Sequence, residues 1–103
     1  MLAAGRTLMG QDLVLLASLR VARVEVCKKP RVAIIPTGSE LTSDLRERGK
    51  VVESHSLLLS HLVDEAGGEA RVKPIVADDR RSLAKALREA LRGDEIVFTL
   101  AGS

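Results

Sequence analysis

Aromatic residues are almost absent from this chain, whose 103 residues include one Phe and neither Trp nor Tyr. Proteins that hold single-stranded nucleic acid stack its bases on exposed aromatic rings, so this sequence is poorly suited to that function. A net charge of +2 also gives no strong electrostatic attraction for a polyanion. We interpret the basic run KKPR at 28–31 as a solvated connection and expect no nucleic-acid partner.

Cysteine, histidine and long apolar runs are scarce as well. The lone Cys27 cannot form an internal disulfide, which is typical of a reducing, cytoplasmic location. His55 and His61 lie six residues apart, a spacing that does not place two metal ligands on one helix face, so we interpret both as structural or surface residues. No stretch resembles a signal peptide or could span a bilayer, and we expect no membrane partner.

The residues that are abundant are aliphatic and charged. Hydrophobic residues make up 46% of the chain and charged residues 29%, a balance typical of a globular protein with a core of Leu, Val, Ile and Ala. The length fits one small domain. We therefore expect a single domain over 1–103, with a lead-in helix and strand at 1–29 and a parallel α/β core at 30–103.

Hydrophobic periodicity predicts three helices and four strands. The helices fall at 12–19, 54–68 and 78–93, and the strands at 23–27, 31–35, 69–77 and 95–100. The second strand, RVAII, is a continuous apolar run, as in a strand buried on both faces. Pro74 lacks an N–H group, which favours an edge position for the third strand. The second helix has an apolar face on which Leu58, Leu62 and Ala66 are spaced by four, with Leu59 and Val63 beside them.

The alternation of strands and helices predicts a mostly parallel sheet with helices on both faces, a three-layer α/β/α arrangement. Ligands of such sheets bind beyond the carboxyl ends of the strands. Three polar segments follow these strands: PTGSEL at 36–41, ADD at 77–79 and AGS at 101–103. Because the last segment stops where a turn into a helix is expected, we also expect an incomplete sheet and a fragment of a longer protein.

The first polar segment has the composition of a binding loop. Gly38 can adopt positive φ between the hydroxyls of Thr37 and Ser39, which lets a turn present backbone N–H groups to an anion. Glu40 adds a carboxylate that could hold a divalent cation or a ribose hydroxyl. An ordinary turn with a capping Glu explains the same residues, and both interpretations stay open.

The other two segments also have two interpretations. Asp78 and Asp79 precede a helix, where one carboxylate can cap the N-terminus and the other favours the helix dipole. As adjacent carboxylates at a strand end, they could equally bind Mg²⁺ through water. Gly102 and Ser103 could open a phosphate-binding turn. The residues alone therefore predict an α/β ligand-binding domain with an unspecified ligand.

In their order and spacing, these segments resemble the molybdenum-cofactor biosynthesis domain. The likeness is strongest to the MoeA/gephyrin E-domain family, the molybdopterin molybdenumtransferases. AGRTLMGQDLVLLASL is similar to a lead-in that usually ends in LASLG, and VARVEVCKKPRVAIIPTGSEL to the pattern V-x-V-x-x-x-P-x-V-A-I-I-x-T-G-D-E-L. GKVVESHSLLLSHLVDEAGGEA resembles a G-Q-I-x-D-S-N segment with its helix, and DEIVFTLAGS the strand before an S-G-G-x-S-x-G loop. IVADDRRSLAKALREAL resembles the segment with a paired D-D or D-N, while the lead-in favours the MoeA type over its MogA and MoaB relatives.

This resemblance implies a MogA/MoeA-like fold and a concrete chemistry. Such enzymes take adenylated molybdopterin, cleave the adenylate and insert molybdate, with Mg²⁺ as the usual divalent cation and a homodimer as the assembly. The implied catalytic residues are Asp12, Glu40 and Asp79, of which Glu40 and Asp79 are also the implied metal ligands. The implied ligand-binding residues are Thr37, Gly38, Ser39, Asp78, Gly102 and Ser103.

Several positions depart from the family pattern. Ser39 replaces the usual Asp and so removes a carboxylate that would bind a metal or orient the substrate. Glu53 and His55 replace Asp and Asn, and Ala101 replaces a glycine where the backbone should approach an anion closely. Arg20 replaces a helix-ending Gly, and because left-handed geometry would cost it about 1–2 kcal/mol, we predict that this turn has changed shape.

These departures leave two alternatives to an active enzyme. One is a diverged, non-catalytic module that still binds a pterin or nucleotide. The other is a structural domain that supplies a dimer interface and whose loops bind nothing.

Overall fold

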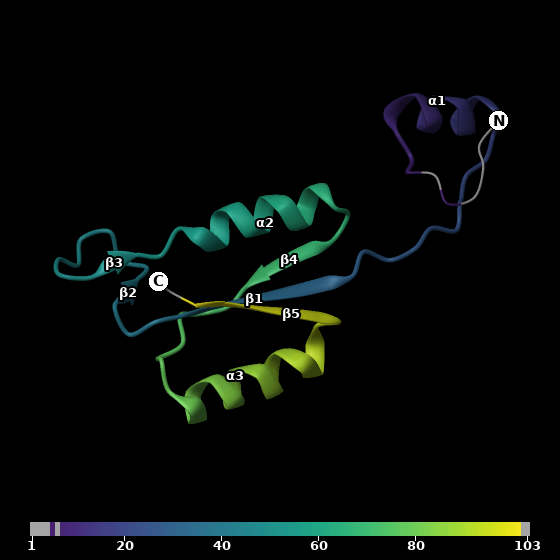
Figure 1. Cartoon of the computed structure of the whole chain (residues 1–103). Helices are drawn as coiled ribbons and strands as arrows, with labels where there is room; N and C mark the ends of the chain where they lie inside the picture. Colours follow the sequence, from purple (N-terminus) through teal and green to yellow (C-terminus); the bar gives the residue numbers. More distant parts are fainter. Residues whose placement is uncertain (1–4, 6, 102–103) are drawn as a thin grey trace.

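A parallel sheet of three strands forms the centre of the computed structural model, which describes residue 5 and residues 7–101 (Figure 1). The strands are β1 (Arg31–Thr37), β4 (Glu69–Val72) and β5 (Ile96–Ala101), in the order β4-β1-β5. Both neighbours pair parallel to β1. The apolar run of the sequence thus became the central strand, buried on both faces as predicted.

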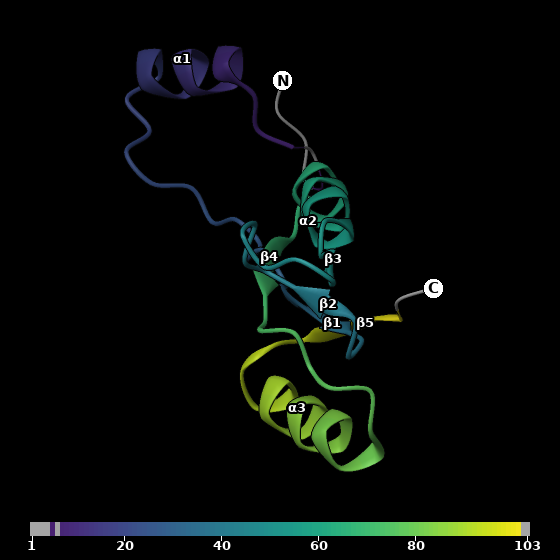
Figure 2. The ribbon, with the colours of Figure 1, turned by 90° about the vertical axis from the view of Figure 1, so that its left-hand side faces the viewer.

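Two helices cover the two faces of this sheet, and Figure 2 shows them on opposite sides of it. Helix α2 (His55–Glu65) packs on β1 and β4, and helix α3 (Arg80–Gly93) packs on β1 and β5. Alternate residues of β1 supply the two halves of the core. Val32 and Ile34 meet Val63 of α2, while Ala33 and Ile35 meet Ala90 of α3. The predicted three-layer α/β/α fold is confirmed.

The predicted apolar face of α2 is buried only in part, through Leu59 and Val63. Leu58 is 63% and Leu62 is 49% exposed, whereas Val63 is 8% exposed. Leu59 packs beside Val63 on the core. Because this sheet is only three strands wide, α2 contacts little more than β1 and β4, and its remaining leucines stay at the surface.

The edge strand β4 is shorter than predicted. It ends at Val72, and the chain rejoins the sheet only through an isolated bridge between Val76 and Thr37. Pro74 lies in the interruption between Val72 and Val76, where no hydrogen bond of the sheet requires an N–H group from it. The predicted edge position of this segment is confirmed.

The lead-in contains the predicted helix, α1 (Gly10–Ser18), but not the predicted strand at 23–27. The structure has no strand in that segment, and Val24 and Val26 are 46% and 69% exposed. A strand requires a neighbour to accept its hydrogen bonds, and here the chain runs alone between α1 and the sheet (Figure 1). An alternating pattern in the sequence was therefore not sufficient to form a strand.

The turn after α1 also differs from the prediction. Arg20 adopts the left-handed conformation, with φ of 58°, so the replacement of glycine has not changed the shape of this turn. Val21 N–H donates to Leu16 O at 2.9 Å and Arg20 N–H to Ala17 O at 3.0 Å, which are the two bonds of a Schellman motif. Helix α2 ends in the same motif, with Gly67 (φ 94°) at the position of Arg20.

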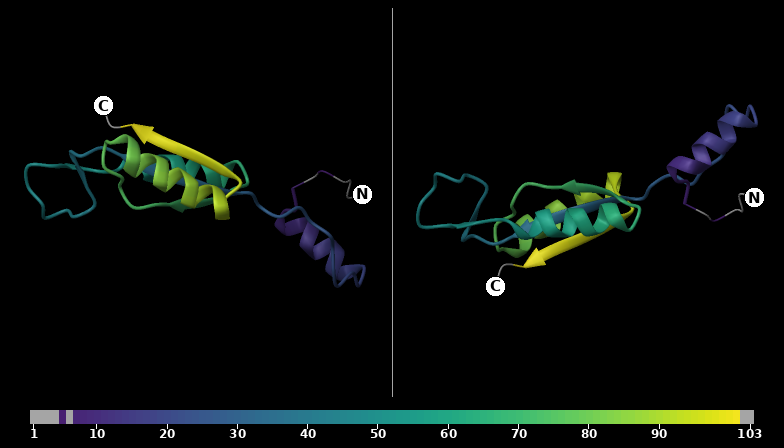
Figure 3. Two further views of the ribbon diagram at one scale, coloured as in Figure 1. Left: turned by 90° about the horizontal axis from the view of Figure 1, so that it is seen from below. Right: turned by 90° about the horizontal axis from the view of Figure 1, so that it is seen from above.

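A second, very small sheet was not predicted. It pairs β2 (Leu41–Thr42) with β3 (Val51–Val52), and the loop at 43–50 connects them. Thr42 holds that loop, because its hydroxyl donates to Glu47 at 2.6 Å and accepts from Asp44 N–H at 3.0 Å. Figure 3 shows this loop at one end of the 59 Å long molecule and α1 at the other.

The helices of the described residues are also informative about membranes. None of them combines the length and the apolar character that crossing a bilayer requires.

Candidate functional site

The polar segments that follow β1 and β4 meet at one edge of the sheet, beside Ala101 at the end of β5. Thr37 is paired with Ala101 of β5 and bridged to Val76 on the other side. Its hydroxyl donates to Leu100 O at 2.9 Å, and Gly38 N–H donates to Val76 O at 3.0 Å. Parallel strands end on the same side, so the topology itself gathers these loops.

The turn at Gly38 positions the next two residues. Gly38 has φ of 151°, and a Cβ atom added to it would lie 2.8 Å from Oε1 of Glu40. The Glu40 carboxylate therefore folds back over the glycine, into space that only glycine leaves open. Ser39 Oγ accepts from Asp78 N–H at 3.3 Å, which connects the first loop to the second.

The backbone donors of this turn are divided between two roles. Gly38 N–H is committed to the ladder and cannot turn toward a ligand in this conformation. Within the described residues, the N–H groups of Ser39 and Glu40 have no hydrogen-bond partner. Two successive free N–H groups after a glycine turn form a small concavity suited to an anion.

The acidic pair lies at the start of α3, where Asp79 is the N-cap. Its carboxylate accepts from Ser82 N–H and from Ser82 Oγ, both at 2.8 Å. These hydrogen bonds, above all the one from the backbone of Ser82, lower the pKa of Asp79 below its ordinary value. The prediction that one of the two aspartates caps this helix is confirmed.

Of the remaining predicted residues, the structure describes only Asp12, and it is not brought to this edge. Asp12 lies in α1, where its carboxylate accepts from Met9 N–H at 2.9 Å, and α1 is at the other end of the molecule (Figure 1). Gly102 and Ser103 lie outside the described residues. The other six predicted positions, Thr37, Gly38, Ser39, Glu40, Asp78 and Asp79, belong to the gathered loops.

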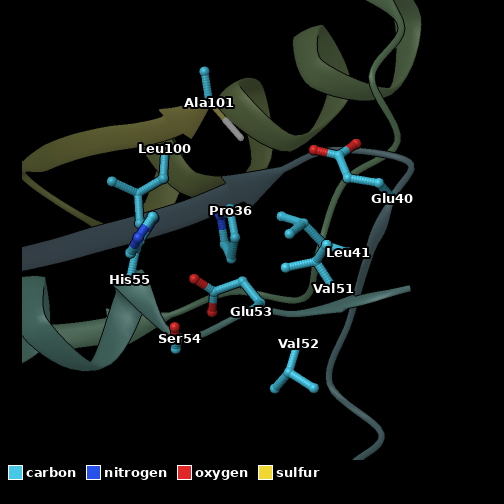
Figure 4. A pocket seen from close by; sticks show the side chains of 10 residues that line it. All are labelled: Pro36, Glu40, Leu41, Val51, Val52, Glu53, Ser54, His55, Leu100 and Ala101. Carbon is cyan, nitrogen blue, oxygen red and sulfur yellow. The ribbon is translucent and has the colours of Figure 1, made fainter. Parts of the chain in front are cut away.

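A cavity of about 100 Å³ opens beside these loops (Figure 4). Glu40 and Ala101 come to it from the predicted segments, and Glu53, Ser54 and His55 come from the turn into α2. The sequence prediction had not included that turn among the site residues, although it had marked two of its positions as departures from the family pattern. The cavity wall thus carries two carboxylates and one imidazole.

A wider, open groove adjoins the cavity. Its volume is about 980 Å³, and Ser39, Lys50 and Lys73 contribute polar side chains to its lining. The same five residues, Pro36, Leu41, Val52, Glu53 and Ser54, line both hollows. A ligand with one group in the cavity could therefore extend its larger part into the groove.

The site does not contain a ready-made metal centre. In the part of the chain that the structure describes, no three His, Cys, Asp or Glu side chains come together to hold an ion. Of the two predicted metal ligands, Asp79 already binds Ser82, while the Glu40 side chain has no partner among the described residues. Mg²⁺ often takes only one or two carboxylates and completes its shell with ligand phosphates and water, and Glu40 fits that kind of coordination.

Comparison with known proteins identifies one family. Residues 33–103 match the family model described as "Probable molybdopterin binding domain". The chain is 33% identical to a molybdopterin molybdenumtransferase of Staphylococcus aureus over 98% of its own length, and 31% identical to one of Nostoc over 99%. It spans about a quarter of the length of these relatives, 25% and 24%.

Solved structures agree with this match. A crystal structure of the molybdopterin biosynthesis MoeA protein of Pyrococcus horikoshii superimposes with a TM-score of 0.78 and 35% identity over 89% of this chain. Another structure, also titled as a molybdopterin biosynthesis MoeA protein from Pyrococcus horikoshii, gives a TM-score of 0.86 and 27% identity over 95% of this chain. This chain covers 25% and 26% of those two structures.

Proposed function

This chain belongs to the molybdopterin-binding domain family of molybdenum cofactor biosynthesis, and from that premise we propose that it binds adenylated molybdopterin for molybdate insertion. The observation that carries the proposal is the meeting of the polar segments after β1 and β4 with the end of β5, beside a cavity at one edge of the sheet. In the proposed enzyme, this chain supplies part of a molybdopterin molybdenumtransferase. Pterin and molybdate are the substrates.

The dimensions of the two hollows support a divided ligand. A cavity of about 100 Å³ holds about three water volumes, which suits one phosphate-sized group. Sites for whole drug-sized ligands measure roughly 300–1,000 Å³, and the adjoining groove of about 980 Å³ is in that range. We assign the anionic group to the cavity, near the free N–H groups of Ser39 and Glu40, and the ring system to the groove.

Charge is the main obstacle to binding, because Glu40 faces an anionic ligand. A bound Mg²⁺ would supply positive charge that offsets the negative charges of Glu40 and of the ligand. Glu40 would hold it together with ligand phosphate oxygens, and Asp79 would join only after releasing Ser82. Thr37 keeps the first loop on β5 through Leu100, while Asp78 and Ser39 hold the first two loops together.

A homodimer in the cytoplasm is part of the same proposal. Leu58 and Leu62 of α2 leave apolar surface that a second copy could cover. For the proposed catalytic role of Asp12, the lead-in of this chain or of a second copy must approach the edge of the sheet. Sedimentation velocity on the chain and on a Leu58→Lys variant would test the assembly, with a dimer expected only for the former.

Isothermal titration tests the binding proposal directly. Adenosine monophosphate carries the phosphate and nucleotide of the adenylated ligand, so we expect saturable heat on titrating it into the chain with Mg²⁺ present. A chain that is folded by circular dichroism but gives no heat at millimolar nucleotide and none with molybdopterin would overturn the proposal.

A non-catalytic binding module is the second candidate, and Ser39 is the observation that favours it. Its hydroxyl holds Asp78 N–H, yet it lacks the charge that the family pattern places there. We expect Ser39→Asp to make nucleotide binding more dependent on Mg²⁺, and Ser39→Asn, which is similar in size but neutral, to leave it unchanged. Equal metal dependence in the two variants would argue that no ligand was lost at this position.

A further inference from the structure

His55 is the only residue of the cavity wall that can carry a positive charge. The other nine lining residues are two glutamates, one serine and six apolar residues, namely Pro36, Leu41, Val51, Val52, Leu100 and Ala101. Figure 4 shows the imidazole standing at the start of α2, on the side of the cavity that faces Leu100. An anion in this cavity therefore has one source of side-chain positive charge within the described residues.

The two glutamates of the wall are in different states. Glu53 accepts from Ser56 N–H at 2.9 Å and from Ser56 Oγ at 2.5 Å, so its charge is already used to hold the first turn of α2. Glu40 has no such partner in the described part of the chain. These are the charged groups that share the cavity with His55, since the lining contributed by β5 is apolar.

We propose that His55 contacts the anionic group of the ligand and makes ligand binding depend on pH. The proposal rests on the proposed function, because it assigns a residue to the same site. A protonated imidazole can donate a hydrogen bond from each of its two nitrogens, and its positive charge offsets the negative charges of the glutamates. The neutral ring has one donor nitrogen and no charge. Asn, the residue usual in the family at this position, has no charge to lose, so this dependence is specific to a chain with His55.

The two histidines of the chain allow a matched experiment. His61 lies on the same helix and pairs with Glu65 at 3.1 Å, away from the cavity lining. Nucleotide binding is measured by isothermal titration at about pH 5.5 and about pH 8, either side of the range in which imidazole normally changes charge. The variants are His55→Asn, His55→Lys and the control His61→Asn, with folding checked by circular dichroism.

The nucleotide phosphate itself changes charge in this range, because its second pKa is near 6. Comparing the variants with the wild-type chain at the same pH cancels this effect of the ligand. At the lower pH we expect His55→Asn to bind about three- to tenfold more weakly than the wild-type chain, and at the higher pH equally well. His55→Lys should bind well at both, and His61→Asn should follow the wild type. An Asn variant with the wild-type profile would overturn this inference alone, whereas a wild-type chain that binds at neither pH would overturn the proposed function with it.

Discussion

At the scale of single residues, Gly38 determines how the first loop is built. It combines positive φ with the close approach of Glu40, and both depend on the missing Cβ. We expect Gly38→Ala to lower the free energy of unfolding by about 1–3 kcal/mol, because this region of φ is sparsely populated by other residues. Nucleotide affinity should fall as well, since the methyl group pushes Glu40 aside. Urea unfolding and isothermal titration measure the two effects.

Gly49 offers the matched control for that prediction. It also has positive φ, 85°, but an added Cβ there would meet no atom within 4 Å. Gly49→Ala should therefore destabilise the fold and leave nucleotide affinity unchanged. If it reduced affinity as much as Gly38→Ala, the loss would come from general instability and not from the displaced carboxylate.

Asp79 gives the site a predictable pH response. Its hydrogen bonds to Ser82 lower its pKa in the folded chain, so the unfolded chain binds the proton more readily. The resulting stabilisation is complete above the ordinary pKa of an aspartate, near 3.9, and is lost as the pH falls through the lower folded value. The stability difference between wild type and Asp79→Asn, measured by urea unfolding, should therefore shrink between neutral pH and about pH 3.

Asp78 is the control for this titration. Its side chain forms no hydrogen bond or ion pair within the described residues, so Asp78→Asn should leave the pH profile of stability close to that of the wild type. A profile altered by Asp78→Asn and not by Asp79→Asn would reverse the assignment of the cap.

At the scale of elements, α1 and α2 end in the same Schellman motif with different residues at the left-handed position. Gly67 adopts that conformation without strain, whereas for Arg20 the left-handed conformation costs about 1–2 kcal/mol in free energy. We expect Arg20→Gly to stabilise the end of α1 by about 1 kcal/mol. Hydrogen exchange of the Arg20 and Val21 amides should then slow by about fivefold.

The side chain of Arg20 must be separated from its backbone strain. Arg20→Ala removes the charge and keeps the Cβ, so exchange at the end of α1 should stay as in the wild type. Equal slowing in the Ala and Gly variants would attribute the effect to the guanidinium and refute the strain argument.

At the scale of the whole molecule, Asp94 links the end of α3 to the edge strand. Its side chain is 2% exposed and lies 3.1 Å from Lys73 Nζ and 3.6 Å from Arg71 Nε. Asp94→Asn would leave two cations without their shared partner. Because the side chains of those cations are 32% and 41% exposed, we expect a loss of about 1–3 kcal/mol in urea unfolding, below the range of a fully buried pair.

The pair between Arg31 and Glu95 is the natural comparison. Its ion pair has the same distance of 3.1 Å as that of Lys73 with Asp94, and Glu95 also accepts from Arg31 N–H at 2.6 Å, but both side chains are about half exposed. Glu95→Gln should therefore cost much less stability than Asp94→Asn. If Glu95→Gln lowered the free energy of unfolding more than Asp94→Asn, burial would not explain how strongly Asp94 stabilises the fold.

The sequence was sufficient where local pattern and burial agree. The run at 31–35 could be placed in the middle of a parallel sheet, because its four successive apolar residues after Arg31 are typical of a strand buried on both faces. Pro74 marked the edge strand, and Asp79 the start of α3, through properties of one residue each. The segments 36–41 and 77–79 could be assigned to one edge since parallel strands end on the same side.

Only the tertiary structure decided the features that depend on contacts between residues distant in the chain. The alternation at 23–27 indicated a strand, but without a second strand beside it the segment stayed exposed. The leucines of α2 have helical spacing, yet the width of the sheet selected Val63 and Leu59 for the core. The sequence by itself determined the layers and the loops that meet. Only the tertiary structure brought His55 to the cavity that Leu100 and Ala101 of β5 also line, because residues distant in the chain share a wall only once the sheet has formed.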